Sequence, residues 1–425
     1  MTTQAYATSS RSIAEPQEAT AESGQRVTGG LLAIPGFLAM SFSNGIVHSF
    51  SMRMHGMIVA WLVLEMTGSK LWLGIVSGVP ALSIVVFSLL GGLLADSRDA
   101  RRTLIVSRGL LAVVSLAAAV LAASGGMDRG TLMVFVLVSV GLMAADMPVA
   151  RTLVLQSVGS ARLASASAAN LVTLNLFNIA GPLALGVMIG KTGAEAALFV
   201  LFGGYVAAML LTAKQPAGVT PPRPRGGNPA GEILAGFVYL RSTPAVAALV
   251  ALGFLVILAG VYFGMVPVYA REVLRVGPEG LGLLTASFSV GSLTGAAYMT
   301  ARGGMRHRGR FVAGLSLVFG AGMVAFALSG NLALSCLISF VMGVTAAFWQ
   351  NTLSVLVQVV AAPAMRGRAV AVFTMGFQLA TAGWLLGGVL ATLLSVQAAV
   401  VLAGLAFAIL STLIFAVCRE VREID

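Results

Sequence analysis

Charged residues are scarce in this chain. Only 10% of its 425 residues are Asp, Glu, Lys or Arg, whereas 58% are hydrophobic and the mean hydropathy is +0.95. Soluble proteins carry about 25% charged residues. So few charges cannot cover a water-facing surface, so lipid must surround most of the chain. The composition therefore indicates a polytopic membrane protein.

Acidic residues are fewer still. Of the fifteen Asp and Glu residues, only Glu65 and Asp146 fall at the edges of long apolar segments, and none falls near a segment centre. Proton relays in membrane transporters commonly use an intramembrane carboxylate or histidine. A coupling proton would therefore have to bind a histidine, Asp96, Asp146 or the substrate itself.

The sequence lacks the residue patterns that metal sites, nucleotide-binding sites and hydrolytic active sites require. Three histidines and two cysteines give no metal-ligand spacing, and Cys336 and Cys418 both lie in apolar runs. No Gly-Lys-Ser/Thr phosphate loop, Ser-His-Asp arrangement or basic segment interleaved with aromatic residues is present. We therefore predict no enzymatic activity, no metal, no cofactor and no nucleic-acid partner.

Long apolar segments dominate what is present. A membrane-spanning helix needs about 20 apolar residues. Reading for that length predicts an all-α protein with twelve transmembrane helices. The segments lie near 37–64, 71–94, 103–124, 130–150, 165–190, 195–213, 244–270, 278–300, 311–329, 332–352, 368–392 and 396–418.

Two polar stretches divide the chain. Residues 1–30 have no apolar core, which is typical of a disordered cytoplasmic tail rather than a signal peptide. Residues 214–231 are rich in Pro and Arg and are expected to form a cytoplasmic linker. The linker separates two predicted six-helix bundles, at 31–213 and 232–418, and a cytoplasmic tail follows at 419–425.

The two halves resemble each other at a separation of about 200 residues. Thr152-Leu153 recurs as Thr352-Leu353, and the basic turn at 98–102 has a counterpart at 302–310. A duplicated six-span unit with a binding site near the midplane is a transporter architecture.

The distribution of basic residues predicts the orientation. With both termini inside, one span holds Arg53, and about four times as many of the other basic residues are cytoplasmic as are external. The external ones are Lys70, Arg129, Lys191, Arg271 and Arg275. Lys and Arg accumulate in cytoplasmic loops. This rule explains the net charge of +11 and places both termini in the cytoplasm, with the protein in the plasma or inner membrane.

The turn at 92–104 resembles the signature Gly-x-x-x-Asp-Arg-x-Gly-Arg-Arg between spans 2 and 3 of the major facilitator superfamily. Gly92, Asp96, Arg101 and Arg102 match it, and the similarity extends from Phe37 to Cys418. Three further stretches resemble the branch that contains the enterobactin exporter. They are Ala60-Trp-Leu-Val-Leu-Glu-Met-Thr-Gly-Ser69, Asp146-x-Pro148-x-x-Arg151 and Arg366-Gly367-Arg368.

The resemblance implies two pseudo-symmetric six-helix bundles and a cytoplasmic conformational switch. Asp96 would be the switch acid, placed at the N-terminus of span 3 where it can engage the helix dipole. The alternative is that these charges only fix the topology. The residues assigned to the switch are Gly92, Asp96, Arg101, Arg102, Asp146, Arg151, Arg302, Arg366 and Arg368.

Two other motifs, one after span 4 and one in span 5, lead to separate predictions. Asp146 and Arg151 are expected to pair with each other or with the nearby switch rather than to relay protons. In span 5, Gly181-Pro182 matches the antiporter signature of the superfamily, but Phe177 replaces a glycine and Gly186 comes one residue late. This pattern supports a helix bend and close packing and leaves drug–proton antiport open.

Arg53 is the strongest candidate for substrate binding. It lies near the middle of span 1, between His48 and His55. A charged group at the bilayer centre is costly and usually faces the bundle interior or a cavity. Arg53 is therefore expected to bind an anionic part of the substrate, with His55 or His48 as a proton-linked partner. Alternatively, span 1 begins later, or Arg53 bonds to backbone carbonyls.

Other polar residues on the spans are candidates for the same cavity. They are Asn170 and Asn178 on span 5, Gln350 and Asn351 at the end of span 10, and Thr374, Gln378 and Trp384 on span 11. The alternative is that the buried amides only hold helices together. The aliphatic, Met-rich remainder suits an amphipathic substrate.

We predict a monomeric secondary active transporter that works by alternating access in the lipid bilayer. It would export a small amphipathic molecule, siderophore-like or drug-like, with protons as the candidate coupling ion. The alternatives are transport of lysophospholipid or another lipid, solute uptake, and a non-transporting membrane sensor.

Overall fold

The protein is helical throughout the part that the structure describes. The computed structural model describes residues 36–81, 83–84, 87, 99–158, 163–215, 229–302, 308–378 and 380–422. Within these residues, ten helices are long and apolar enough to cross a membrane. The predicted tail at 1–30, most of the predicted linker at 214–231, and the signature residues Gly92 and Asp96 lie outside them.

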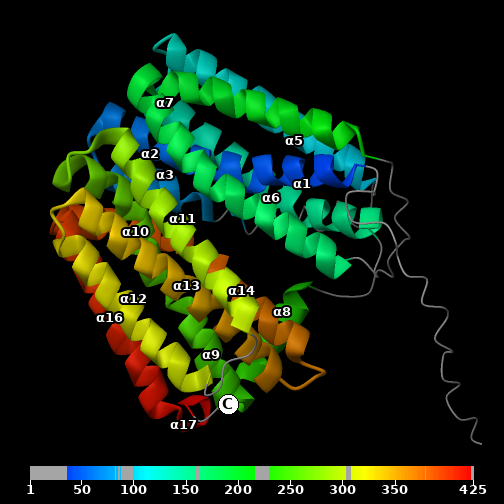
Figure 1. Cartoon of the computed structure of the whole chain (residues 1–425), viewed down its shortest axis with the longest axis vertical. Coiled ribbons are helices and arrows are strands. Elements are labelled where there is room, and N and C mark those ends of the chain that lie inside the picture. Colours follow the sequence, from blue (N-terminus) through cyan, green and yellow to red (C-terminus); the bar gives the residue numbers. More distant parts are fainter. Residues whose placement is uncertain are drawn as a thin grey trace, which may run out of the picture.

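The first bundle is built from the helices before the predicted linker (Figure 1). Span 1 runs without interruption from Phe37 to Thr67, although its middle turn is a π-helix. The elements are α1 (Phe37–Gly45), η2 (Ile46–Ser51), α2 (Met52–Thr67), α3 (Lys70–Gly78), α5 (Ala100–Ala123), α6 (Arg129–Val158) and α7 (Leu163–Ala213). Helix α3 is the described beginning of span 2.

Helix α7 contains two spans joined at Gly193. This glycine has φ 85° and ψ 170°, a left-handed conformation that only glycine adopts readily. Both arms pack against α1. Thr173 and Phe177 of the first arm border Gly45. The Ala208 carbonyl of the second arm accepts a hydrogen bond from Ser43. The fifth and sixth predicted spans are therefore the two arms of one helical hairpin.

The second bundle follows the same plan. Its seventh span consists of α9, α10 and η4, and its eleventh consists of α14 and α15. The elements are α8 (Pro229–Ser242), α9 (Pro244–Phe254), α10 (Val256–Val268), η4 (Tyr269–Val273), α11 (Gly277–Arg302), α12 (Arg308–Leu328), α13 (Leu332–Val360), α14 (Arg366–Gln378), α15 (Ala380–Leu393), α16 (Val396–Val417) and α17 (Arg419–Arg422).

Short, well-capped turns join the helices at one end of the molecule. Ser69 caps α3 and Asn331 caps α13, each side chain accepting a backbone N–H of the first turn. Asp128 accepts hydrogen bonds from the Thr131 N–H and hydroxyl, which hold the pKa of its carboxyl below the usual range. These caps satisfy exposed backbone groups, so turns of two to five residues suffice.

The two bundles contact each other at this same end, which we call the closed end. Helices α7 and α11 lie side by side in Figure 1, and a Cβ added to Gly282 would lie 2.5 Å from the Pro182 carbonyl oxygen. Helices α3 and α15 meet similarly, since a Cβ on Gly388 would lie 2.7 Å from the Gly74 Cα. Glycines at these crossings allow the backbones to approach closely.

Two charged contacts also join the bundles at the closed end. Lys70 Nζ lies 2.7 Å from Glu272 Oε2, and the Arg271 guanidinium lies 5.9 Å from the centroid of the Trp61 ring. Because both members of the Lys70–Glu272 pair are partly exposed, we expect this ion pair to contribute about 0–1 kcal/mol.

Reversing the charge at Lys70 should therefore shift the balance between open and closed states modestly. Lys70→Glu places two carboxylates together and should slow transport about two- to five-fold. The double variant Lys70→Glu/Glu272→Lys restores the pair and should regain most of the rate. Initial flux rates in proteoliposomes at low and high salt test this, and equal defects in the single and double variants would contradict it.

Candidate substrate cavity and buried charge cluster

A cavity of about 440 Å³ lies between the two bundles. This volume falls within the range of about 300–1,000 Å³ that is usual for small-molecule sites. Its wall is contributed by span 1, α3 and α7 from the first bundle and by α10, α11 and α15 from the second. Movement of one bundle against the other would therefore change its shape.

Arg53 supplies a permanent positive charge to this cavity. It lies near the middle of a 31-residue helical segment, Phe37–Thr67, and lines the cavity. Its Nε donates a hydrogen bond of 3.2 Å to Asn178 Oδ1 on α7. In the described residues no carboxylate pairs with Arg53. Asn178 therefore orients the guanidinium without neutralising it.

The π-helix η2 sets the rotation of span 1 around the cavity. His48 and Arg53 both line the wall. In a regular α-helix, positions five residues apart point about 140° away from each other. The i→i+5 hydrogen bonding of a π-turn reduces this angle. The extra residue in η2 thus brings His48 and Arg53 toward one side of the helix.

His55 faces away from the cavity, contrary to its prediction as a substrate-binding residue. It is buried against α6, where its ring lies 5.0 Å from the Phe135 ring and its Nε2 lies 2.6 Å from Ser139 Oγ. The Ser139 hydroxyl donates to the Phe135 carbonyl, so His55 acts as the donor to Ser139. His55 therefore joins two helices of the first bundle.

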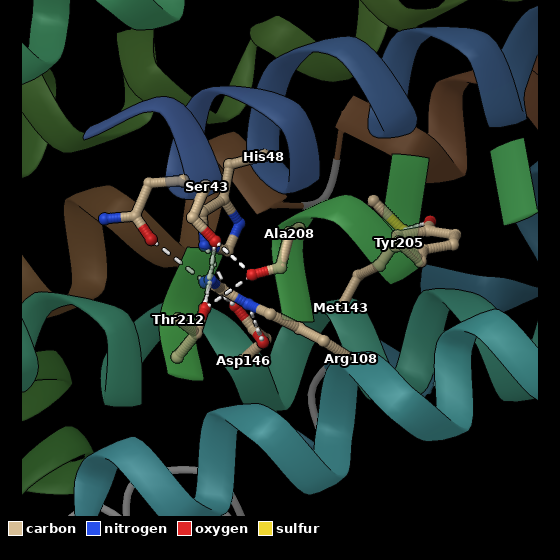
Figure 2. Close-up of polar contacts among 9 residues, drawn as sticks. Ser43, His48, Arg108, Met143, Asp146, Tyr205, Ala208 and Thr212 are labelled. Atoms are coloured by element: carbon tan, nitrogen blue, oxygen red, sulfur yellow. Dashed lines mark hydrogen bonds and ion pairs between the residues drawn. The ribbon is translucent and has the colours of Figure 1, made fainter. Parts of the chain in front are cut away.

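Arg108 is the centre of a buried polar cluster in the first bundle (Figure 2). Its Nε and Nη2 donate to the two oxygens of Asp146 at 3.2 and 3.1 Å, and its remaining donors reach Asn44 Oδ1, Ser43 Oγ and Thr212 Oγ1. A guanidinium has five N–H donors, and all five have an acceptor in this cluster.

The cluster holds four spans together. Ser43 and Asn44 belong to span 1, Arg108 to α5, Asp146 to α6 and Thr212 to α7. The Arg108 side chain is 1% exposed and that of Asp146 is 0% exposed. A two-pronged Arg–carboxylate pair adds geometric specificity as well as energy. The cluster therefore fixes how these helices pack.

The amphipathic pattern of α5 places Arg108 in the interior. Arg108, Leu111 and Ser115 are buried on one face, whereas Val106 and Val113 are 61% and 64% exposed on the other. The count of cytoplasmic basic residues in the sequence includes Arg108, which is wrong because its side chain is buried inside the bundle. The sequence did contain a sign that Arg108 is buried, because an acidic residue, Asp146, lies in the next span.

Asp146 does not pair with Arg151. The two residues are five apart on one helix, so they point in different directions, and Arg151 is exposed. Asp146 also lies well inside the span Arg129–Val154 rather than at its edge, since α6 continues to Val158.

His48 connects the cavity to the buried cluster. It lines the cavity wall, and its Nε2 lies 3.1 Å from Asp146 Oδ1 (Figure 2). Its side chain is 13% exposed, whereas the carboxylate behind it is fully buried. The His48 side chain therefore lies between the cavity and the Arg108–Asp146 pair.

The remaining candidates fall into two groups. Trp384 lines the cavity as expected, and its backbone carbonyl also approaches Gly74 across the bundle interface. The side chain of Gln378 lies outside the described residues. Four candidates are not among the described residues that line this cavity: Asn170, Gln350, Asn351 and Thr374. The last two donate hydrogen bonds to carbonyls four residues earlier in their own helices.

Apart from Asp146, the described residues assigned to the switch lie toward the other end of the bundles. Arg101 donates to the Ala213 carbonyl at the end of α7, and Arg102 is 87% exposed beside Asp99. Asp99, three residues after Asp96, caps α5 by accepting the N–H groups of Arg101 and Arg102. In the second bundle Arg366 is exposed, Arg368 is partly buried, and the Arg302 side chain lies outside the described residues. No ion pair joins the two sets within the described residues.

The glycines of span 5 differ in their surroundings. Gly186 packs against α11, since an added Cβ would lie 2.7 Å from the Pro278 carbonyl oxygen. Gly181 borders Phe50 of span 1, and Pro182 lies within the first arm of α7. These contacts show close packing at Gly186, where the two bundles cross.

Two helical bundles around a shared cavity define a secondary transporter of the major facilitator type rather than an enzyme. The chain belongs to the transmembrane secretion effector family of this superfamily, which it matches over residues 37–425. It is 25% identical over 270 residues to the enterobactin exporter of Citrobacter koseri, covering 62% of each protein. It is 24% identical over 269 residues to that of Salmonella typhi, covering 62% of this chain and 63% of the relative. These alignments therefore span about three fifths of the relatives.

Solved transporter structures share the fold, which confirms the predicted fold class. A POT family transporter in complex with a thioalcohol-conjugated peptide has a TM-score of 0.72 at 14% identity, covering 92% of this chain and 99% of that one. A bacterial homologue of the human lysosomal transporter Spinster, inward-facing and occupied, has a TM-score of 0.71 at 11% identity, covering 91% and 96%. At these identities the likeness concerns the fold alone.

Proposed function

We propose that this transporter exports a small amphipathic molecule that carries an anionic group. The observation that carries the proposal is Arg53, an unneutralised cation on the wall of the cavity between the bundles. A guanidinium matches the planar geometry of a carboxylate and also binds phosphate in a two-pronged manner. A sulfonate offers similar acceptor oxygens. The anionic group of the substrate would therefore bind at Arg53 and Asn178.

The rest of the wall suits an apolar body. Phe263, Phe288 and Trp384 contribute aromatic rings, and Met52 and Met57 contribute flexible thioether side chains. Aromatic rings bury large areas, and methionine adapts to irregular shapes. Such a wall accepts related apolar bodies, while the charged group fixes their orientation.

The direction of transport is inferred from the charge distribution and the relatives. The closed end carries few of the basic residues, so the positive-inside rule places it outside the cell and both termini in the cytoplasm. The cavity would then load from the cytoplasm. Two relatives are enterobactin exporters, and the family is described as secretion effectors, which supports export.

Flux through purified protein in proteoliposomes tests the function. Enterobactin is one test compound, because of the relatives. Naphthalene-2-sulfonate and naphthalene-2-sulfonamide form a matched pair with the same ring system and with or without a charge. We expect the sulfonate to be transported faster than the sulfonamide. Absence of protein-dependent flux for all three compounds would contradict the proposal.

Arg53→Gln should reduce transport of the anionic compound about ten- to a hundred-fold. A hydrogen bond to a charged group contributes about 1.5–3 kcal/mol, and glutamine keeps a donor but loses the charge. Transport of the neutral sulfonamide should change less than about two-fold, within the range of minor surface effects. Initial rates for both compounds give this comparison.

Arg241→Gln is the matched control, because Arg241 is exposed at the end of α8 and outside the cavity. It should leave both rates close to those of the parent. Equal losses for the sulfonate and the sulfonamide in Arg53→Gln would show that Arg53 supports the structure rather than recognises charge.

A further inference from the structure

If the protein exports an anion, as proposed above, the charges around the cavity indicate which gradient drives the export. Among the described residues, the charged and titratable groups near His48 are Arg53 on span 1, Asp146 of α6 and Tyr262 of α10 across the cavity. Beyond Asp146 lie Arg108 of α5 and Tyr205 of α7, whose hydroxyl donates to Met143 Sδ. None of the described residues lining the cavity is Asp or Glu.

The Asp146 carboxylate is committed to Arg108. It accepts two donors of the guanidinium and is fully buried. Protonation of Asp146 would leave the buried Arg108 without its counter-charge, which is strongly unfavourable. Asp146 is therefore poorly suited to take up and release a proton in each transport cycle. Among the described residues, the exchangeable proton nearest the cavity would have to be on His48.

A proton on His48 would favour binding of an anion rather than compete with it. Protonated His48 would add a second positive charge to the wall that holds Arg53. Linkage is reciprocal, so each ligand would raise the affinity for the other. Antiport requires the opposite relation, in which the proton and the substrate exclude each other from the carrier. A pH gradient therefore cannot drive anion export by exchange at this site.

We infer that the transporter carries the anion without a compensating proton and that the membrane potential drives export. The interior of the cell is electrically negative, so an anion that moves outward moves down the potential. Arg53 remains within the carrier throughout the cycle, whereas the anion crosses the membrane. One negative charge leaves in each cycle, and the proton is not a co-reactant.

Accumulation of naphthalene-2-sulfonate in proteoliposomes tests this inference, because a sulfonate stays charged across the accessible pH range. Valinomycin with a ten-fold inward potassium gradient makes the interior positive. We expect about ten-fold accumulation of the sulfonate, since about 59 mV corresponds to a ten-fold ratio for one charge. Reversing the potassium gradient should expel it, whereas the sulfonamide should not respond.

The control arm imposes a one-unit pH gradient and clamps the potential at zero with equal potassium and valinomycin. We expect no accumulation in that arm. Accumulation that follows the pH gradient and ignores the potential would overturn the inference and leave the proposed function standing. Absence of protein-dependent flux of the sulfonate in both arms would contradict the proposed function itself. A His48→Gln variant that abolished pH-driven flux would identify His48 as the proton carrier and would also overturn the inference.

Discussion

Replacing Arg108 with methionine is expected to lower the free energy of unfolding by about 3–5 kcal/mol. Methionine is of similar length and apolar, so the substitution removes the charge while filling much of the space. It leaves the fully buried Asp146 carboxylate without its counter-ion, which is the costly part of breaking a buried pair. The hydroxyls of Ser43 and Thr212 also lose a partner. Chemical or thermal unfolding in detergent measures the effect.

The double variant Arg108→Met/Asp146→Leu should recover most of that loss. It removes both charges, so neither has to be buried alone, and apolar replacements of buried ion pairs are often neutral or better. Arg102→Met is the control, because this neighbouring arginine is 87% exposed and should change stability by less than about 0.5 kcal/mol. A double variant no more stable than the single one would show that the pair contributes by its shape rather than by its charge balance.

Gly388→Val is expected to abolish most transport while the two bundles remain folded. The Cβ of the new side chain would lie 2.7 Å from the Gly74 Cα and 2.8 Å from the Lys70 carbonyl oxygen, both on α3 of the other bundle. Overpacking of this kind costs about 1–3 kcal/mol, and it applies only when the closed end is shut. The balance should shift about 5- to 150-fold toward the state in which that end is open.

Cysteine accessibility reports this shift directly. Ser77 lines the cavity, so Ser77→Cys can be labelled by a membrane-impermeant maleimide added from outside, in a background with Cys336→Ala and Cys418→Ala. Labelling should be slow in the parent and faster with Gly388→Val. Gly314→Val is the control, since a Cβ added to Gly314 would meet no atom within 4 Å. Transport at the parental rate in Gly388→Val would exclude the glycine crossing as part of the closed state.

The general fold could be read from the sequence because the bilayer imposes a simple rule on composition and length. Spans such as α13 and α16 are long apolar runs that begin at a capping residue, Asn331 or Ser395, so hydropathy and capping together indicate them. The hairpin at Gly193 was also accessible, since Lys191 and Glu195 interrupt the apolar run. The π-turn in span 1 was not, because nothing in the residue types of 46–51 distinguishes it from an α-helix.

The site was only partly predictable, because helix rotation decides which polar residues meet. Arg53 and Asn178 were both singled out, and the structure brings them into contact. His55 was grouped with Arg53 because it is close in sequence, yet it points toward α6. Arg108 was missed although it lies within the predicted span 103–124, because it was counted with the cytoplasmic basic residues just before that span. Its partner lies on another helix, and such pairings depend on tertiary packing.

The π-turn at 46–51 gives span 1 a surplus residue, and this has a consequence for how the transporter could change. The residues before it, Ser43 and Asn44, are held by Arg108, while Arg53 after it faces the cavity. Removing one residue from the turn would restore α-helical spacing, so that Arg53 would follow His48 by four residues, which lie about 40° apart around an α-helix. With the first half anchored, Arg53 would therefore keep its place on the cavity wall. A single-codon deletion within this turn should thus leave the charged group of the cavity in place, whereas a deletion in a regular α-helix rotates everything beyond it by about 100°.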